Sequence, residues 1–150
     1  MKRILNKNIV IVILTFLIPG IIALLIRDSF SMYKQLIRPK YSPPSIAFPI
    51  AWNILYLLMS IAIILVKHDD ENNLKIYYLQ LLLNALWTPI FFLFKMYYLA
   101  LFELIILLVI VIYMTYKFYK YNKIATYLLI PYIVWLLFAL YLNYFVAIYN

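Results

Sequence analysis

Long runs without charged residues alternate with short polar segments along this chain. Each run has about the 20 residues that a helix needs to cross a hydrocarbon core of about 30 Å. The runs are also about twice as long as a membrane β-strand and lack its alternation of polar and apolar residues. The pattern therefore predicts an all-α fold, an integral membrane bundle of five transmembrane helices. The expected spans are residues 8–26, 44–66, 75–94, 97–118 and 124–148.

Composition supports a membrane protein and leaves no room for a separate soluble domain. The chain has 150 residues, of which 69% are hydrophobic and 12% charged, and the mean hydropathy is +0.99. These values lie far from those of a soluble protein. We expect one transmembrane domain over residues 1–150. The basic start, with Lys2, Arg3 and Lys7, resembles that of a secretory signal, but no small-x-small cleavage site follows, so we expect an uncleaved anchor.

Basic residues gather on one side of the predicted membrane. If the helices alternate in direction, the amino terminus and the second and fourth loops share a side. That side carries eight basic residues and the opposite side five. The positive-inside rule therefore predicts a cytoplasmic amino terminus. A net charge of +8 distributed over span boundaries, without a soluble domain, does not indicate nucleic-acid binding.

Several chemistries are excluded by residue counts. The chain has no cysteine, one histidine (His68) and one glycine (Gly20). Thiolate metal sites, disulfides, bis-histidyl haem ligation and glycine-rich phosphate loops are therefore excluded. No serine has a histidine and an acid disposed as a triad. We predict no metal site and no required cofactor.

The third span carries polar and aromatic side chains along one helical face. Gln80, Asn84, Trp87 and Phe91 follow one another at steps of four, three and four. Because an unpaired amide in hydrocarbon is costly, Gln80 and Asn84 should face neighbouring helices or a cavity. The pattern leaves two roles open for these side chains: hydrogen bonding between helices, or lining a ligand pocket.

The fifth span repeats this arrangement. Pro131, Trp135, Ala139 and Asn143 are spaced at steps of four, and Tyr132 lies beside them. The small Ala139 leaves a gap that either a flat hydrophobic ligand or another helix can occupy. Together with the stripe on the third span, this pattern allows a shared aromatic pocket or ordinary packing.

Prolines and one acid are the other unusual residues within the spans. Pro89 and Pro131 each remove a backbone hydrogen bond and so predict a kink. Glu103 is the one acid inside a span, and intramembrane ionisable residues suggest function. No relay partner for it is visible, so a structural role is favoured, either protonated or hydrogen-bonded to an amide or a tyrosine of another helix.

The segment before the second span is basic and rich in proline. Arg38 and Pro39 are followed by Pro43 and Pro44, and Trp52 lies early in the following helix with Tyr56 one turn later. Such a segment has a restricted shape. We expect it to form a lid over a pocket.

In these residues the chain resembles the translocator protein family, also called the tryptophan-rich sensory protein family. Four blocks of residues carry the resemblance and together extend over nearly the whole chain. They are Tyr33-x-x-Leu36-x-Arg38-Pro39-x-Tyr41-x-Pro43-Pro44 with Trp52-x-x-Leu55-Tyr56; Gln80-Leu81-x-x-Asn84-x-x-Trp87-x-x-x-Phe91-Phe92; Leu99-Ala100 with Glu103; and Pro131-Tyr132-x-x-Trp135 with Leu142-Asn143.

The resemblance implies a five-helix bundle whose first loop covers a cavity that binds protoporphyrin IX, haem, sterols or benzodiazepine-site ligands. It also implies possible homodimers and, for a bacterial member, a location in the cell membrane. The expected ligand-binding residues are Trp52, Tyr56, Asn84, Trp87, Phe91, Trp135, Ala139, Leu142 and Asn143. The expected lid residues are Tyr33, Arg38, Pro39, Tyr41, Pro43 and Pro44.

The chain departs from the family pattern at two lid positions, because Met32 and Tyr41 stand where many members have tryptophan. The sterol-recognition pattern at the end of the fifth span is also missing, so cholesterol is not expected as the main ligand.

Three functions are consistent with the sequence. The first is a sensor or transporter that binds a tetrapyrrole. The second is an enzyme that degrades a bound porphyrin in light, with Trp52 and Trp135 as catalytic electron donors. The third is a structural or oligomer-forming membrane protein.

Overall fold

The computed structural model describes every residue from Met1 to Asn150 and contains helices but no strands. Five α-helices are long and apolar enough to cross a membrane, which confirms the predicted fold class. The elements in chain order are α1 (Lys2–Leu25), the 3-10 helix η1 (Arg27–Gln35), α2 (Ala47–Val66), α3 (Glu71–Thr88), the π-helical turn η2 (Pro89–Leu93), α4 (Tyr97–Tyr119) and α5 (Lys123–Tyr149).

The helices begin where their capping groups allow, and this explains the differences from the predicted spans. Helix α3 begins at Glu71 because the Asp70 side chain accepts a hydrogen bond from the backbone N–H of Asn72 at 2.8 Å. The Asn122 side chain caps α5 in the same way. Helix α1 begins at Lys2, six residues before the predicted start, because its polar first turns continue the helix beyond the apolar run.

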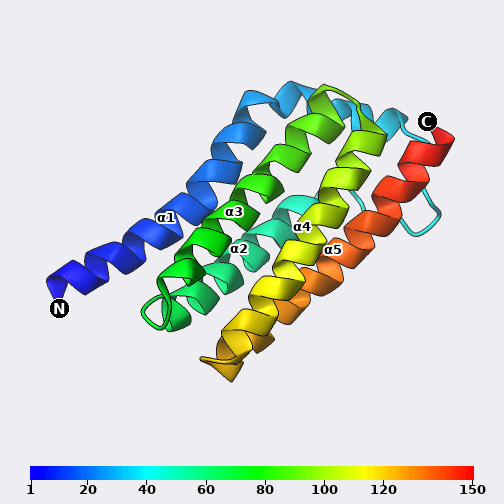
Figure 1. The fold of residues 1–150 in the computed structure, drawn as a ribbon. Helices are drawn as coiled ribbons and strands as arrows, with labels where there is room; N and C mark the ends of the chain where they lie inside the picture. The colour runs from blue at the N-terminus through cyan, green and yellow to red at the C-terminus, as the bar shows by residue number, and fades with distance from the viewer.

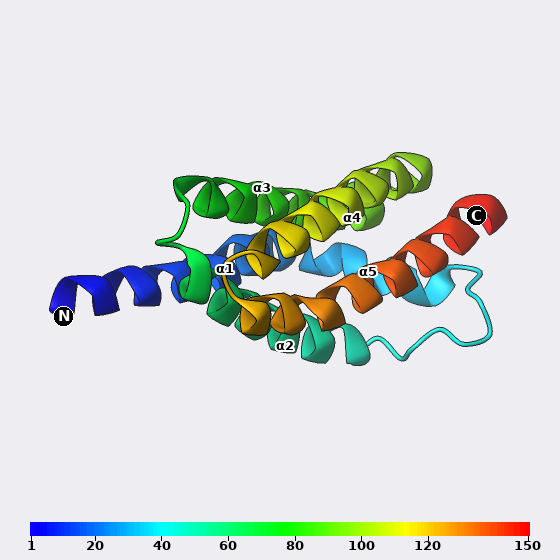
Figure 2. The same ribbon diagram turned by 60° about the horizontal axis from the view of Figure 1, so that its bottom comes forward.

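The five helices form a ring. Helix α1 packs against α2 and α3, α2 packs against α5, and α4 joins α5 to α3. Figure 2 shows the loop between η1 and α2 passing close to the carboxyl-terminal part of α5. The outer faces expose leucine, isoleucine and phenylalanine side chains, which implies contact with lipid in a membrane protein.

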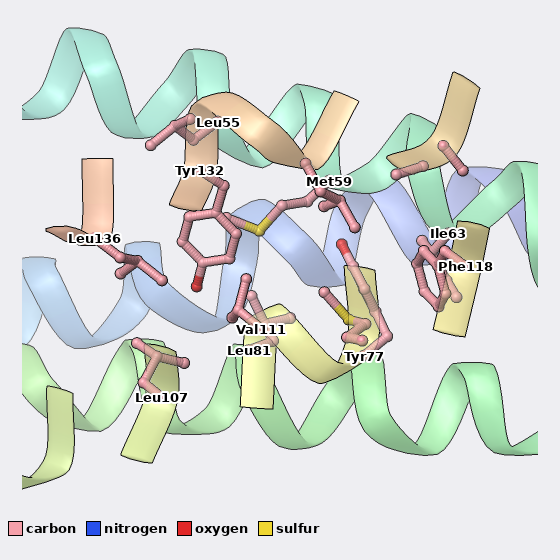
Figure 3. Close-up of a cluster of buried hydrophobic side chains, with 14 of the residues drawn as sticks. Leu55, Met59, Ile63, Tyr77, Leu81, Leu107, Val111, Phe118, Tyr132 and Leu136 are labelled. Atoms are coloured by element: carbon pink, nitrogen blue, oxygen red, sulfur yellow. The ribbon is translucent and has the colours of Figure 1, made fainter. Parts of the chain in front are cut away.

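A tightly packed core fills the ring between α2, α3, α4 and α5. The ring of Tyr132 from α5 lies among Met59 of α2, Leu81 of α3 and Val111 of α4 (Figure 3). All four side chains are at most 1% exposed. Because lipid is as apolar as this core, close packing and hydrogen bonds between helices stabilise the bundle more than the removal of apolar surface from water does.

The prolines within the spans have different effects. At Pro89 the α-helical hydrogen-bond pattern of α3 ends and the π-helical turn η2 begins. Proline has no N–H to donate to the carbonyl of Ala85, so the backbone hydrogen bonds change there from the α-helical to the π-helical pattern. Helix α5 continues through Pro131, and α1 continues through Pro19. Lys95, in the short link to α4, has a φ of 53°, a left-handed conformation that favours glycine.

Candidate functional site: an aromatic cavity beneath the first loop

A cavity of about 500 Å³ lies between α1, α2 and α3, beneath η1. This volume is within the range of about 300–1,000 Å³ that is typical of small-molecule sites. Its wall is mostly aromatic. The aromatic lining residues are Phe16, Phe30, Tyr33, Phe48, Trp52, Tyr56, Trp87 and Phe92.

Helix α2 supplies one aromatic wall because Phe48, Trp52 and Tyr56 recur every four residues and so share a face. The rings of Trp52 and Tyr56 stack, with centroids 5.5 Å apart and planes inclined by 23°. Trp52 also meets the edge of Trp135 from α5, with centroids 6.2 Å apart. Trp52 is therefore held between its own helix and α5 while it faces the cavity.

Helix α1 supplies a second wall that the sequence analysis did not identify. Phe16, Pro19, Gly20 and Ala23 all line the cavity. A methyl group added at Gly20 meets no other atom within 4 Å, so the glycine leaves space beside the cavity. The available signal was the spacing of these residues on one helical face, together with the only glycine and the only proline of a span that is aliphatic except for Asn8, Thr15 and Phe16.

Behind the cavity, a chain of hydrogen bonds joins three helices. The hydroxyl of Tyr56 donates to Oδ1 of Asn84 at 3.2 Å. Nδ2 of Asn84 donates to the Tyr132 hydroxyl at 2.9 Å, and that hydroxyl donates to Oε1 of Gln80 at 2.8 Å. The prediction that both amides avoid lipid is confirmed, because Gln80 is 0% and Asn84 4% exposed. Asn84 reaches the cavity only through Tyr56, since its own side chain does not line it.

A small second pocket of about 30 Å³ adjoins the main cavity, and Tyr33, Phe48, Trp87 and Phe92 line both. Its volume corresponds to about one water molecule. Its other lining residues are Arg38, Pro39, Ser42, Phe91, Ala139, Leu142, Asn143 and Val146. Six of the residues expected from the sequence therefore lie here rather than in the main cavity, namely Arg38, Pro39, Phe91, Ala139, Leu142 and Asn143.

Trp87 lies between the main cavity and the small pocket and lines both. Its ring stacks on Phe91 with centroids 4.9 Å apart. Its Nε1 donates a hydrogen bond to Oδ1 of Asn143 at 3.0 Å, and Nδ2 of Asn143 donates to the carbonyl of Tyr97 at 3.0 Å. The amide on α5 thus fixes the indole that separates the main cavity from the small pocket.

The stripe predicted on the fifth span is divided by the structure. Trp135 lines neither hollow but packs against Trp52 and Phe48. Pro131 is exposed on the outer face of α5. Ala139 and Asn143 face the small pocket. Three of the nine expected ligand-binding residues line the main cavity directly, and they are Trp52, Tyr56 and Trp87.

The segment expected to form the lid, here called the covering segment, consists of η1 and residues 36–46, and it lines the main cavity with Phe30, Tyr33 and Ser45. The Tyr33 hydroxyl donates a hydrogen bond to the carbonyl of Pro43 at 3.4 Å, and the Arg38 guanidinium lies 4.5 Å from the centroid of the Tyr33 ring. Tyr33 is thus held from two sides. Tyr41, in contrast, is 77% exposed, and Tyr41, Pro43 and Pro44 line neither hollow.

A contact with the last residue of the chain holds the covering segment at its other end. The backbone N–H of Ile37 donates to Oδ1 of Asn150 at 2.9 Å, and Nδ2 of Asn150 donates to the carbonyl of Ile37 at 3.0 Å. The pair resembles one rung of a β-ladder. It ties the loop to the end of α5.

Glu103 lies on α4, away from both hollows. It is 8% exposed, and neither carboxylate oxygen has a hydrogen-bond partner in the protein. The expected bond to an amide or a tyrosine of another helix is therefore not formed.

Comparisons with known proteins identify the family to which the chain is similar. Residues 9–149 match the sequence model of the TspO/MBR family. The chain is similar to the tryptophan-rich protein TspO of Chlorobaculum tepidum, with 30% identity over 75% of each chain. It is 33% identical to the tryptophan-rich sensory protein of Cereibacter sphaeroides, over 75% of this chain and 72% of that one. It is also 30% identical to the translocator protein of Sus scrofa, over 75% of this chain and 70% of the relative.

Proposed function

Since the chain belongs to the TspO/MBR family of membrane proteins, we propose that it binds a tetrapyrrole, protoporphyrin IX or haem, in the aromatic cavity beneath the first loop. The observation that carries the proposal is the cavity itself, about 500 Å³ in volume and lined by aromatic rings from α1, α2 and α3. A planar, largely apolar ligand is stabilised by stacking on such rings. Other flat hydrophobic ligands of the benzodiazepine-site kind fit the same description.

Arg38 adds a cation at the edge of this site. It lies against Tyr33, which lines the main cavity, and itself lines the adjoining small pocket. A tetrapyrrole carries carboxylates on one edge, and a guanidinium forms paired hydrogen bonds with a carboxylate. The macrocycle would then lie beside Trp52 and Trp87, with its acidic edge toward the covering segment.

A fluorescence titration tests the proposal. All three tryptophans lie at or directly behind the cavity, because Trp52 and Trp87 line it and Trp135 contacts Trp52. Protoporphyrin IX added to the purified protein in detergent should therefore quench tryptophan fluorescence with saturation. Trp52→Leu and Trp87→Leu should each weaken binding on the order of tenfold, by losing about 1–2 kcal/mol of stacking.

The matched control is Phe102→Leu, because Phe102 is 62% exposed on the outer face of α4. This variant should bind porphyrin as the unaltered protein does. Quenching that rises linearly without saturation, or equal affinity in all variants, would contradict the proposal and favour a purely structural or oligomer-forming protein.

A second candidate function is light-dependent porphyrin degradation, which the contact between Trp52 and Trp135 favours. Their rings meet edge to face with centroids 6.2 Å apart, and Trp52 faces the cavity. A photoexcited porphyrin would take an electron from Trp52, and Trp135 would then donate an electron to the oxidised Trp52. Dioxygen would take the electron from the reduced porphyrin to give superoxide, which attacks the macrocycle, and an external reductant would return an electron to Trp135. A protein-dependent change in the porphyrin absorption spectrum under light, absent in the dark and reduced in Trp135→Phe, is the expected result. Equal spectra in light and dark would exclude this activity.

A further inference from the structure

A third hollow, distinct from the aromatic cavity and the small pocket, lies at the other end of α1 from the aromatic cavity. It is a groove of about 480 Å³ between the first turns of α1, the end of α2 and the first turns of α3. Along α1 the groove and the aromatic cavity are separated by Thr15, whose side chain is fully buried and hydrogen-bonded to the Tyr77 hydroxyl at 2.6 Å. The groove is therefore independent of the proposed porphyrin site.

The groove is basic, and no carboxylate lines it. Its ionisable lining residues are Arg3, Lys7, Lys67, His68 and Tyr78. Asp69 is exposed, lies outside the groove lining and forms no ion pair, and the two acids that follow it are paired with lysines outside the groove. Asp70 pairs with Lys117 of α4 at 3.0 Å, and Glu71 pairs with Lys75 on the outer face of α3 at 3.8 Å. None of the basic residues that line the groove forms an ion pair within the protein.

Lys67 is the innermost of these cations. It is 7% exposed and forms no ion pair. Its ammonium group donates a hydrogen bond to the side-chain oxygen of Asn8. Burial, and then the charge of Lys7, lower the pKa of Lys67. A buried cation beside a second cation is costly unless an anion joins them.

Two further cations lie together on one face of α1. Arg3 and Lys7 are four residues apart, so like charges lie side by side on the helix and destabilise it in the absence of an anion. The same face continues into Val10 and Ile11, which line the groove together with Leu74 of α3. The groove is therefore cationic at the helix ends and apolar toward the middle of the bundle.

We propose that this groove binds the phosphate headgroup of an anionic phospholipid, with an acyl chain lying along Val10 and Leu74. Arginine and lysine together are well suited to phosphate. Basic pockets between transmembrane helices are known sites for anionic headgroups. The apolar part of the groove favours a lipid over free phosphate, because inorganic phosphate has nothing to place there.

Lipid retention tests the proposal. The full-length protein is purified from vesicles containing equal amounts of phosphatidylglycerol and phosphatidylcholine, and the lipids that remain bound are counted by native mass spectrometry. The unaltered protein should retain phosphatidylglycerol preferentially. The double variant Arg3→Gln, Lys7→Gln should reduce that preference about tenfold. Both side chains are exposed, so the fold should be kept, which the helical circular dichroism signal verifies. Lys67→Met is the second variant and should reduce the preference as well.

The matched control is Lys120→Gln, which removes one positive charge on the same side of the bundle but outside the groove. It should retain lipid as the unaltered protein does. Equal retention of the two lipids by the unaltered protein would overturn the proposal, and so would an undiminished preference in the double variant. Displacement of the bound lipid by an excess of inorganic phosphate would also overturn it, because the site would then be one for free phosphate. Trp52→Leu should leave lipid retention unchanged, so failure here is distinguishable from failure of the porphyrin proposal.

Discussion

The Tyr132 hydroxyl donates a hydrogen bond to Oε1 of Gln80 at 2.8 Å, joining α5 to α3 in the centre of the helix ring. The same hydroxyl accepts a bond from Asn84, which in turn accepts one from Tyr56 at the cavity wall. The proposed binding site is thus connected to the packed core through one buried polar chain. Such a chain rigidifies a core when all its members are paired.

Tyr132→Phe should destabilise the protein by about 1 kcal/mol, because it leaves Oε1 of Gln80 and Nδ2 of Asn84 without their partner. Thermal unfolding in detergent, followed by circular dichroism, measures the effect. Tyr127→Phe, on the same helix but 59% exposed, is the control and should unfold as the unaltered protein does. A melting temperature for Tyr132→Phe equal to that of the control would show that the chain adds nothing to stability.

Two substitutions of Gly20 should distinguish the effect of cavity volume on porphyrin binding from the effect of this position on helix stability. Gly20→Ala should stabilise α1 by up to about 1 kcal/mol, since alanine is the better helix former and its methyl group meets no atom within 4 Å. Gly20→Leu should project a larger side chain toward the cavity and weaken porphyrin binding on the order of tenfold. The fluorescence titration and a thermal melt on both variants test this pair. Undiminished affinity in Gly20→Leu would place the ligand elsewhere.

Asn150→Ala should loosen the covering segment, because it removes both hydrogen bonds to Ile37. Residues 36–46 should then exchange amide hydrogens faster, and porphyrin should associate and dissociate faster, with a smaller change in affinity. Hydrogen exchange by mass spectrometry and stopped-flow quenching measure these effects. Tyr149→Phe keeps the amide clamp and is the control. Exchange rates that match in both variants would mean that the clamp does not hold the loop.

The ion pair between Asp70 and Lys117 should make stability depend on pH in the acidic range. The N–H of Asn72, and then Lys117, lower the pKa of Asp70 below its ordinary value. The stabilisation is therefore fully present above the unfolded pKa of about 3.9 and is lost as the pH falls through the lower, folded value. Asp70→Asn should lower the melting temperature at neutral pH by a few degrees, and the difference should vanish in strong acid. Asp69→Asn is the neighbouring control. A difference that persists unchanged in strong acid would contradict this origin.

The sequence alone determined the fold class and the family. Five charge-free runs of sufficient length leave only helices as membrane spans, because backbone groups in hydrocarbon must be paired within the segment. It also determined that Gln80 and Asn84 face the interior, since unpaired amides are costly in lipid. The family resemblance, with Trp52 and Tyr56 one helical turn apart, predicted both as pocket residues.

Only the tertiary structure decided which of these side chains meet. The third and fifth spans share only the small pocket, which Phe91 and Ala139 both line, whereas Trp135 packs behind Trp52 and lines neither hollow. Helix α1 closes the main cavity with Gly20, and the basic groove forms where Lys67 meets the start of the same helix. A periodic pattern shows which residues share a helix face. It does not show which neighbour that face meets, because the order of helices around the ring is set by packing between spans that are almost equally apolar.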